Sequence, residues 1–326
     1  MELSAFILSA PGRCWRPLVR LAVVGALFLL PASLLAADIF IVQSRPTGAH
    51  AAVSELVKQQ LSSSLPLENN VTVVSPSQLD LIKKTTSGKD YIVTVGTNAF
   101  AVVLASNPTA NVVATLIPEQ TYNVLKSKYN RNDNRISALF IEQSFHRNLD
   151  LARIVLPNRR TGVLLGSGSS RLYGSLSEAR QKQGMDIYLK KLKPGENLVS
   201  ALDQVLKNSS VLIAFADPEV SNRNTAQHIL LTTYRQRIPV VAYSRAYVKA
   251  GALMAVYSTP EQYARQTAEI VLQNISGNSN GLLPPQYPRY FSVEINQSVA
   301  HSLGINLKPV QQIESQLRSL AVAPNE

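Results

Sequence analysis

Residues 161–170 read Thr-Gly-Val-Leu-Leu-Gly-Ser-Gly-Ser-Ser, and this stretch indicates the fold class. Its first half, Thr161–Leu165, is a continuous run rich in apolar residues, as expected for a strand buried on both faces. Its second half is a loop of glycines and serines that opens a helix. A strand, a glycine-rich turn and a helix in this order are typical of an α/β protein with a parallel sheet.

The same alternation extends in both directions along the chain. Short apolar runs predict strands, and segments with a helical period of apolar residues separate them. The predicted strands are Ile39–Val42, Val71–Val74, Tyr91–Val95, Asn111–Ile117, Ile136–Ile141, Thr161–Leu165, Met185–Leu192, Val211–Phe215, Ile238–Tyr243 and Tyr290–Ile295. They form two successive series, so we predict two similar lobes, each a parallel sheet between helices.

Charge and cysteine content limit the kinds of site that the chain can hold. The protein has 32 Lys and Arg against 21 Asp and Glu, a formal net charge of +11. Such an excess favours anionic surroundings, although a solvated basic face explains it equally well. The single cysteine, Cys14, lies near the N-terminus. Disulfides and thiolate metal sites are therefore excluded from the rest of the chain.

The N-terminal 37 residues have the pattern of a signal peptide. Basic residues from Arg13 to Arg20 precede the apolar run Leu21–Leu30, and small residues at Ala36 and Ala37 follow it. The apolar run is shorter than the roughly 18 to 20 residues that a spanning helix needs. We therefore predict a cleaved signal peptide over residues 1–37 and a periplasmic mature protein.

Polar residues follow several of the predicted strands. The Gly166–Ser170 loop is either a plain tight turn or a ligand-binding loop, and arginine at 171 argues against a dinucleotide fingerprint. After Val95, Thr97 or Asn98 is expected to cap the next helix, a role that does not exclude ligand contact. Asp217 is expected either to cap the helix that follows it or to receive an amine.

Signatures of catalysis, metal binding and nucleic-acid binding are missing from the sequence. The four histidines, at 50, 146, 228 and 301, show no metal-ligand spacing. The sequence contains neither a Gly-x-Ser-x-Gly elbow nor a phosphate-binding loop. Aromatic residues are not interleaved with a basic cluster. We therefore expect no enzyme activity, no cofactor, no metal and no nucleic-acid partner.

Four stretches in the second half resemble a known family when they are taken in order. They are Val211–Pro218 (VLIAFADP), Arg237–Val241 (RIPVV), Tyr247–Leu253 (YVKAGAL) and Val293–Gly304 (VEINQSVAHSLG), and Asp90–Thr97 (DYIVTVGT) agrees in the first half. This order is similar to that of the uncharacterised ABC-transporter substrate-binding family. Better understood relatives of that family bind aromatic amino acids.

The resemblance implies the type I periplasmic-binding-protein fold, in which two doubly wound lobes are joined by three hinge crossings. Lobe 1 would comprise residues 38–141, completed by about 246–285, and lobe 2 would comprise 142–245, completed by about 286–326. The ligand would lie in the cleft between the lobes. Carried over by position, the candidate ligand-binding residues are Ser44, Thr97, Asn98, Ser167, Asp217 and Ser244.

The function implied is capture of a small solute, with an amino-acid-like ligand as one candidate, for an inner-membrane ABC permease. The alternative is an envelope interaction or regulatory protein of the same fold, with an envelope receptor as its partner. Two departures from the family pattern bear on this choice. Residues 96–99 read Gly-Thr-Asn-Ala where the family often has Gly-Thr-Pro-Ala, and no Asp-Pro follows Ile117. They indicate a branch with a different ligand, or one that has lost transport.

Overall fold

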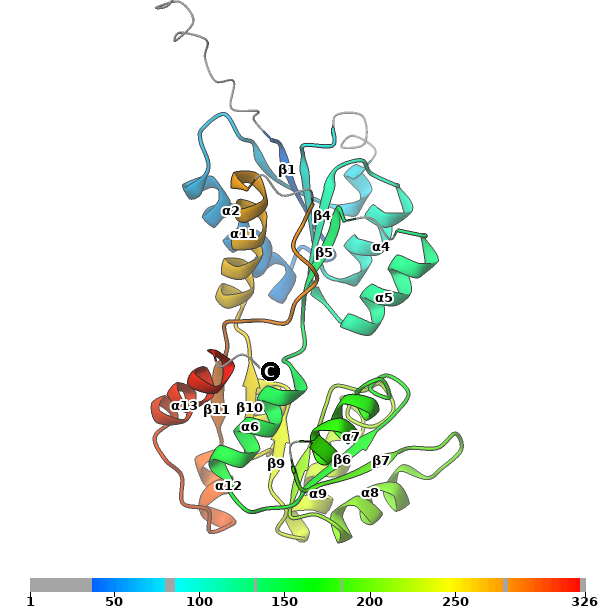
Figure 1. Ribbon diagram of the computed structural model, residues 1–326, viewed down its shortest axis with the longest axis vertical. Helices are drawn as coiled ribbons and strands as arrows, with labels where there is room; N and C mark the ends of the chain where they lie inside the picture. Colours follow the sequence, from blue (N-terminus) through cyan, green and yellow to red (C-terminus); the bar gives the residue numbers. More distant parts are fainter. Residues whose placement is uncertain (1–36, 80–85, 132–133, 183, 278–280, 323–326) are drawn as a thin grey trace, which may run out of the picture. The chain divides into compact units, whose positions relative to one another are not determined.

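Two β-sheets, each between layers of helices, make up the described part of the chain (Figure 1). The computed structural model describes residues 37–79, 86–131, 134–182, 184–277 and 281–322. Both sheets belong to one unit of the chain, Ala37–Glu326. The fold class predicted from the sequence, two doubly wound α/β lobes, is confirmed. The predicted signal peptide lies outside the described residues, apart from Ala37.

The first sheet, sheet A, contains five parallel strands in the order β2-β1-β3-β4-β5. The strands β3, β4 and β5 are buried along their whole length, which explains their continuous apolar sequences. The strand bounds are β1 (Ile39–Gln43), β2 (Val71–Val74), β3 (Tyr91–Val95), β4 (Asn111–Ile117) and β5 (Ile136–Phe140).

Helices cover both faces of sheet A and bury a separate core on each (Figure 1). On one face α2 (Gly48–Ser64) packs against α11 (Pro260–Ser276). The other face is covered by α4 (Thr97–Ala105) and α5 (Glu119–Lys128), and Tyr122 of α5 is fully buried in this core. A short 3₁₀ helix, η1 (Pro76–Gln78), follows β2. We call this part the sheet A lobe.

The second sheet, sheet B, has the order β11-β10-β9-β8-β6-β7. All neighbouring strands are parallel except β10 and β11, which are antiparallel. The strand bounds are β6 (Thr161–Leu165), β7 (Ile187–Lys191), β8 (Val211–Ile213), β9 (Val240–Ala242), β10 (Met254–Tyr257) and β11 (Ser292–Ile295).

Sheet B also separates two cores. One core is formed with α6 (Phe145–Val155), α7 (Leu172–Lys182) and α13 (Val310–Val322), and the other with α8 (Leu198–Lys207), α9 (Ala226–Arg235) and α10 (Arg245–Lys249). The short helix α12 (Gln297–Ser302) is capped by Asn296, whose side chain accepts a hydrogen bond from the Val299 N–H. We call this part the sheet B lobe.

The chain crosses between the lobes three times: between β5 and α6, between β10 and α11, and between Gln286 and β11. The expected lobe boundaries need one correction. Residues 246–257 were assigned to the first lobe, but β10 is hydrogen-bonded to β9 and β11 within sheet B. The chain therefore returns to sheet A only after Tyr257. The capping box of Thr259 and Gln262 starts α11 at that point.

No helix in the described ranges combines the length and the apolar character needed to cross a membrane.

Candidate functional site

A cavity of about 710 Å³ lies between loops of the two lobes. Most of its wall comes from the carboxyl ends of strands and the segments that follow them, which is where ligands bind in doubly wound sheets. The lining residues there are Leu116 and Pro118 at the end of β4, Ile141–Gln143 after β5, Gly168–Ser169 after β6, Phe215–Pro218 after β8, Tyr243–Arg245 after β9 and Tyr257–Ser258 at the end of β10. The volume suits a small organic molecule.

Aromatic side chains supply much of this wall. Six of them come from both lobes and from the crossings: Phe145, Phe215, Tyr243, Tyr257, Tyr263 and Tyr287. Aromatic rings bury large apolar areas with few rotatable bonds, and tyrosine adds a polar end. The Tyr263 hydroxyl is already used, because it donates to the Ile141 carbonyl at 2.6 Å. A flat, ring-bearing ligand is the shape that such a wall accommodates best.

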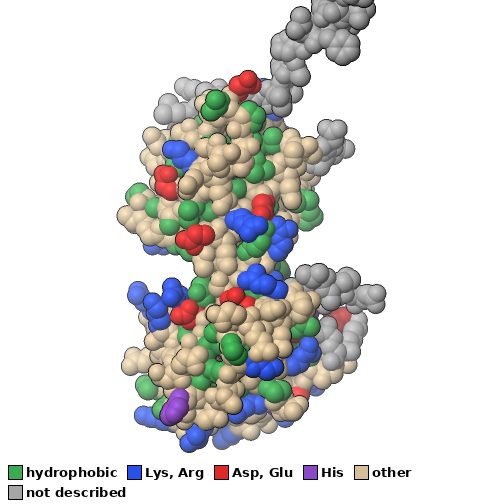
Figure 2. Space-filling view, turned by 90° about the vertical axis from the view of Figure 1, so that its left-hand side faces the viewer, with side chains coloured by type: hydrophobic (Ala, Val, Ile, Leu, Met, Phe, Trp, Pro, Cys, Tyr) green, Lys and Arg blue, Asp and Glu red, His purple; other side chains and the backbone are tan. Residues whose placement is uncertain are grey.

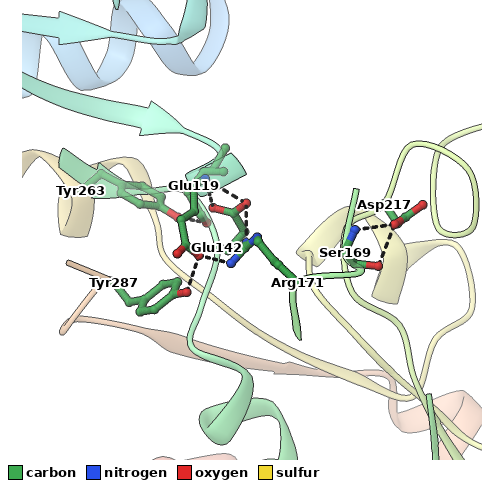
Figure 3. A network of polar contacts seen from close by, with 8 residues as sticks. Glu119, Glu142, Ser169, Arg171, Asp217, Tyr263 and Tyr287 are labelled. Atoms are coloured by element: carbon green, nitrogen blue, oxygen red, sulfur yellow. Dashed lines mark hydrogen bonds and ion pairs between the residues drawn. The ribbon is translucent and has the colours of Figure 1, made fainter. Parts of the chain in front are cut away.

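Two oppositely charged side chains, Arg171 and Glu142, face each other at the cavity (Figure 3). Arg171 of the sheet B lobe reaches Glu119 at the start of α5 and lies 3.8 Å from Glu142 in the first crossing. The Glu142 carboxylate also accepts a hydrogen bond from the Glu119 N–H, whose nitrogen lies 3.2 Å from each of the two carboxylate oxygens. Ion pairs of guanidinium and carboxylate are directional as well as attractive. Arg171 therefore links the two lobes at the edge of the cavity.

Burial raises the pKa of Glu142 above its usual value of 4.5, because removal from water disfavours the carboxylate. The Glu119 N–H and Arg171 oppose this shift without cancelling it. Since the folded state holds the proton more tightly than the unfolded state, Glu142 destabilises the fold least at low pH. The cost grows as the pH rises through the raised pKa.

Replacing Glu142 with glutamine should therefore change the pH dependence of stability. The Glu142→Gln protein should gain in melting temperature relative to wild type at pH 8, where wild type carries the buried charge. The gain should shrink at pH 4.5, where wild-type Glu142 takes up its proton. Melting curves of both proteins at the two pH values test this. An equal difference at both would contradict a raised pKa.

Tyr287 connects Glu119, the partner of Arg171, to the core of the sheet A lobe. Its hydroxyl donates to Glu119, and burial raises the pKa of Tyr287 to about 12. Its ring packs edge-on against Phe140, which packs in the same way against Tyr122. The phenol is thus neutral at physiological pH and held in place by a row of aromatic contacts.

A break in the regular pairing of β4 and β5 shapes the wall at Leu116. The register shifts between Thr115 and Ile117, and Leu116 has a φ of +52°. Positive φ is uncommon for leucine and marks a local distortion. Because such bulges re-aim a side chain at the end of a strand, this one places Leu116 in the cavity wall.

One network of hydrogen bonds joins all three crossings. Gln143 of the first crossing donates to the Ser258 hydroxyl of the second at 2.8 Å, and Ser258 donates to the Tyr290 carbonyl of the third at 2.6 Å. Arg147 donates to the Gln143 side chain and, at 2.7 Å, to the Pro288 carbonyl. Burial lowers the pKa of Arg147 to about 10, so it still carries its charge at neutral pH. The crossings are thus tied to one another.

The sequence identifies the family to which this architecture belongs. A family model described as ABC transporter substrate binding protein matches residues 61–313. The chain belongs to this family. The resemblance found in the ordered sequence stretches is thereby confirmed, and membership indicates a substrate-binding protein.

Solved structures share the fold of this substrate-binding protein. A substrate binding protein with adhesive properties from Clostridium difficile, in its ligand-free, open structure, is 18% identical with a TM-score of 0.66, covering 84% of this chain and 96% of its own. An ABC domain in complex with L-Trp from Streptococcus pneumoniae is 15% identical with a TM-score of 0.54, covering 86% and 98%. A conserved domain protein from Vibrio cholerae is 19% identical with a TM-score of 0.54, covering 86% and 98%. No curated protein matches the sequence.

The glycine-serine loop after β6 packs tightly against the loop after β8. A Cβ atom on Gly166 would lie 2.3 Å from Asp217 Oδ1, and one on Gly168 would lie 2.4 Å from Pro218 Cδ. The Ser169 N–H and hydroxyl donate to Asp217 Oδ2 at 2.8 and 2.6 Å, as Figure 3 shows. The glycines of the binding protein thus allow close packing of two loops, which favours the tight-turn interpretation of this stretch.

Asp217 uses both of its carboxylate oxygens within the protein. The other oxygen, Oδ1, accepts the N–H groups of Glu219 and Val220 at 2.8 and 3.0 Å. The side chain is buried, and the residue also lines the cavity. Asp217 was expected either to cap the following helix or to receive an amine, but no helix begins here, because α9 starts only at Ala226. The contacts show that Asp217 instead caps the turn that follows it.

The six candidate ligand-binding residues are not gathered in one place. Asp217 and Ser244 line the cavity, and the Ser244 side chain also caps α10 by accepting the Tyr247 N–H. The other four, Ser44, Thr97, Asn98 and Ser167, are not part of the cavity wall formed by the described residues. Ser167 is exposed, and its N–H donates to Glu219 at 2.9 Å.

Ser44, rather than Thr97 or Asn98, supports the start of α4. Its hydroxyl accepts the Ala99 N–H at 2.9 Å, whereas the N-cap position is Gly96, which has no side chain. The capping expected of Thr97 or Asn98 was wrong, because Ser44 at the end of β1 reaches the same N–H from the neighbouring strand. Thr97 and Asn98 are exposed.

These positions make a matched pair for a stability measurement. Ser44→Ala should lower the free energy of unfolding by about 1 kcal/mol, the usual effect of losing a helix cap. Thr97→Ala should change it by less than about 0.5 kcal/mol, as is usual for an exposed site. Urea unfolding of both variants checks this. A larger loss for Thr97→Ala than for Ser44→Ala would contradict the assignment.

Several wall residues could not be found from local sequence signals. Arg171 and Asn148 follow no strand directly, and Glu142, two residues after β5, belongs to no recognisable motif. Asn148 lies on α6 and donates from Nδ2 to the Ser144 carbonyl at 3.0 Å. Its buried Oδ1 has no hydrogen-bond partner among the described residues. The wall of the binding protein therefore contains an acceptor that a donor group could satisfy.

The described residues contain no group of three or more His, Cys, Asp or Glu side chains that could hold a metal ion.

Proposed function

We propose that this protein captures a small, ring-bearing, amino-acid-like solute in the cavity and delivers it to an ABC-type importer. The observation that carries the proposal is the composition of the wall, in which six aromatic side chains line the same cavity as Glu142 and Arg171. The ring of the solute would pack among the aromatic side chains. Its amine would face Glu142 and its acid group would face Arg171, since each would exchange one partner for an equivalent one.

Other observations support the same proposal. The Streptococcus pneumoniae structure of this fold is a complex with L-Trp, which makes L-tryptophan the first compound to test. Family membership supports an ABC permease as the partner. A cleaved signal peptide and a periplasmic location complete the proposal. The predicted signal peptide ends at Ala37, but Ala37 is buried and its carbonyl accepts a hydrogen bond from the Asn69 side-chain amide at 3.0 Å, which favours cleavage after Ala36 instead.

Calorimetric titration with a matched set of compounds tests this function. L-Tryptophan carries the ring and both charges, tryptamine lacks the acid, indole-3-propionate lacks the amine and L-alanine lacks the ring. Loss of either charged group should weaken binding by roughly ten- to a hundredfold, corresponding to about 1.5–3 kcal/mol for a charge-assisted hydrogen bond. Equal affinity for all four, or no binding of any, would contradict the proposal. The second outcome would favour the alternative role in envelope interactions.

A further inference from the structure

A groove of about 830 Å³ lies on the sheet B lobe between α9 and α10. One wall is a single face of α9, because its lining residues recur at helical spacing: Ala226, Gln227, Leu230, Leu231 and Tyr234. Arg223, in the turn before α9, extends this wall. Residues 243–251 provide most of the other wall. The groove therefore follows α9 for roughly 13 Å, at 1.5 Å per residue from Ala226 to Tyr234.

Large apolar side chains are exposed to solvent in the groove. Leu231 and Tyr234 are 49% and 53% exposed, and they lie three residues apart on the same face of α9. Leu230 and Tyr247 beneath them are buried. Exposed apolar side chains grouped in a groove are typical of protein–protein contact sites.

The segment that forms the groove carries positive charge only. Residues 220–260 contain five Lys and Arg and no Asp or Glu. Arg245 is paired with Glu294 at 3.2 Å. The other four have no side-chain hydrogen bond or ion pair within the described residues: Arg223, Arg235, Arg237 and Lys249. Lys and Arg side chains are also frequent over the face of this lobe in Figure 2.

We propose that this groove binds an acidic polypeptide segment of another protein. Apolar side chains of that segment pack over Leu231 and Tyr234, while its carboxylates face Arg223 and Lys249. Charge complementarity decides the sign of the partner, since the unpaired Arg223 lines the groove, the unpaired Lys249 precedes the lining residue Ala250, and no Asp or Glu of the described residues lines it. The length along α9 matches about two and a half turns of a helix, which favours a polypeptide over a compact solute. This proposal does not rest on the proposed binding of a solute in the cavity.

The test uses two labelled peptides of fourteen residues. One is a helix-forming peptide of glutamate, leucine and alanine, and the other has lysine in place of every glutamate. Fluorescence anisotropy with the whole protein should show the glutamate peptide binding at least about tenfold more tightly than the lysine peptide. Added salt should weaken this binding, because exposed charges are screened. Equal affinity for both peptides, or binding of neither, would overturn the proposal.

Variants assign the binding to the groove. Arg223→Glu combined with Lys249→Glu should weaken the glutamate peptide at least about tenfold, and so should Leu231→Ser combined with Tyr234→Ser. All four side chains are exposed, so melting curves should stay unchanged. Lys207→Glu and Val199→Ser, on exposed positions of α8, should leave binding as in wild type. Equal losses in the α8 controls would show non-specific attraction and overturn the site.

Two further measurements separate other occupants of the groove. Phosphatidylglycerol vesicles that sediment with wild type but not with the charge-reversed protein, without any binding of the glutamate peptide, would show that the groove binds a lipid surface. A dimer in analytical ultracentrifugation that Leu231→Ser abolishes would show that a second copy fills the groove. Either result would contradict the proposed acidic polypeptide. Monomeric protein that ignores the vesicles but binds the glutamate peptide agrees with it.

Discussion

An Asp217→Asn protein should melt roughly 6–12 °C below wild type. Asp217 accepts four hydrogen bonds in a buried position, two from Ser169 and two from the Glu219 and Val220 N–H groups. Asparagine keeps the size of the side chain but turns one oxygen into a donor, so two buried donors lose their acceptor. Each unsatisfied buried group costs about 1–3 kcal/mol, and about 3 kcal/mol in all is a cautious sum. In a protein of this size each kcal/mol corresponds to about 2–4 °C.

Glu219→Gln is the matched control for this change. Glu219 lies in the same loop and accepts the Ser167 N–H, but it is exposed. Water can replace its contact, so the melting temperature should stay close to that of wild type. If Asp217→Asn melted like wild type yet lost affinity for an amine-bearing ligand, Asp217 would be a ligand-binding group and not a structural one. Thermal melting and calorimetry on the same samples distinguish these outcomes.

Filling the cavity should remove solute binding almost completely. Ala216 and Thr121 line it from opposite lobes, and neither is buried. A tryptophan at either position would occupy the space that we assign to the ring of the solute. The affinity for L-tryptophan should fall by more than about a hundredfold in Ala216→Trp and in Thr121→Trp, a loss of more than about 2.7 kcal/mol.

Smaller changes at the same positions serve as controls. Ala216→Ser and Thr121→Ser keep the cavity open and should bind L-tryptophan within about threefold of wild type, since neither position is fixed by packing. Tryptophan at the exposed Val199 of α8 tests for a general effect of added surface rings. Binding retained in both cavity-filling variants would place the solute outside the cavity.

The fold could be predicted from the sequence because its signals are local. Buried parallel strands such as Tyr91–Val95 and Thr161–Leu165 need apolar side chains on both faces, and this requirement is visible in a short window. The strand β10 escaped prediction because Met254–Tyr257 follows α10 closely and has only four residues. Without it, the second crossing was placed too early.

The site could be predicted only in outline because it depends on distant parts of the chain. The rule that ligands bind beyond the carboxyl ends of strands points to the loops of Asp217 and Ser244, and both residues line the cavity. It could not tell which loops reach the cavity, and Ser44 instead supports α4. Arg171 and Glu119 are 52 residues apart and meet only because of how the lobes are placed. Such a pair leaves no local pattern in the sequence.

The central claim is that the cavity holds a small, ring-bearing solute, and native mass spectrometry of two proteins tests it most directly. Wild type and Ala216→Trp are purified under non-denaturing conditions and incubated with the same metabolite extract of the producing cells. The account predicts one small-molecule adduct on wild type, with an aromatic fragment on dissociation, and none on Ala216→Trp. The same adduct on both proteins, or no adduct on either, would contradict it.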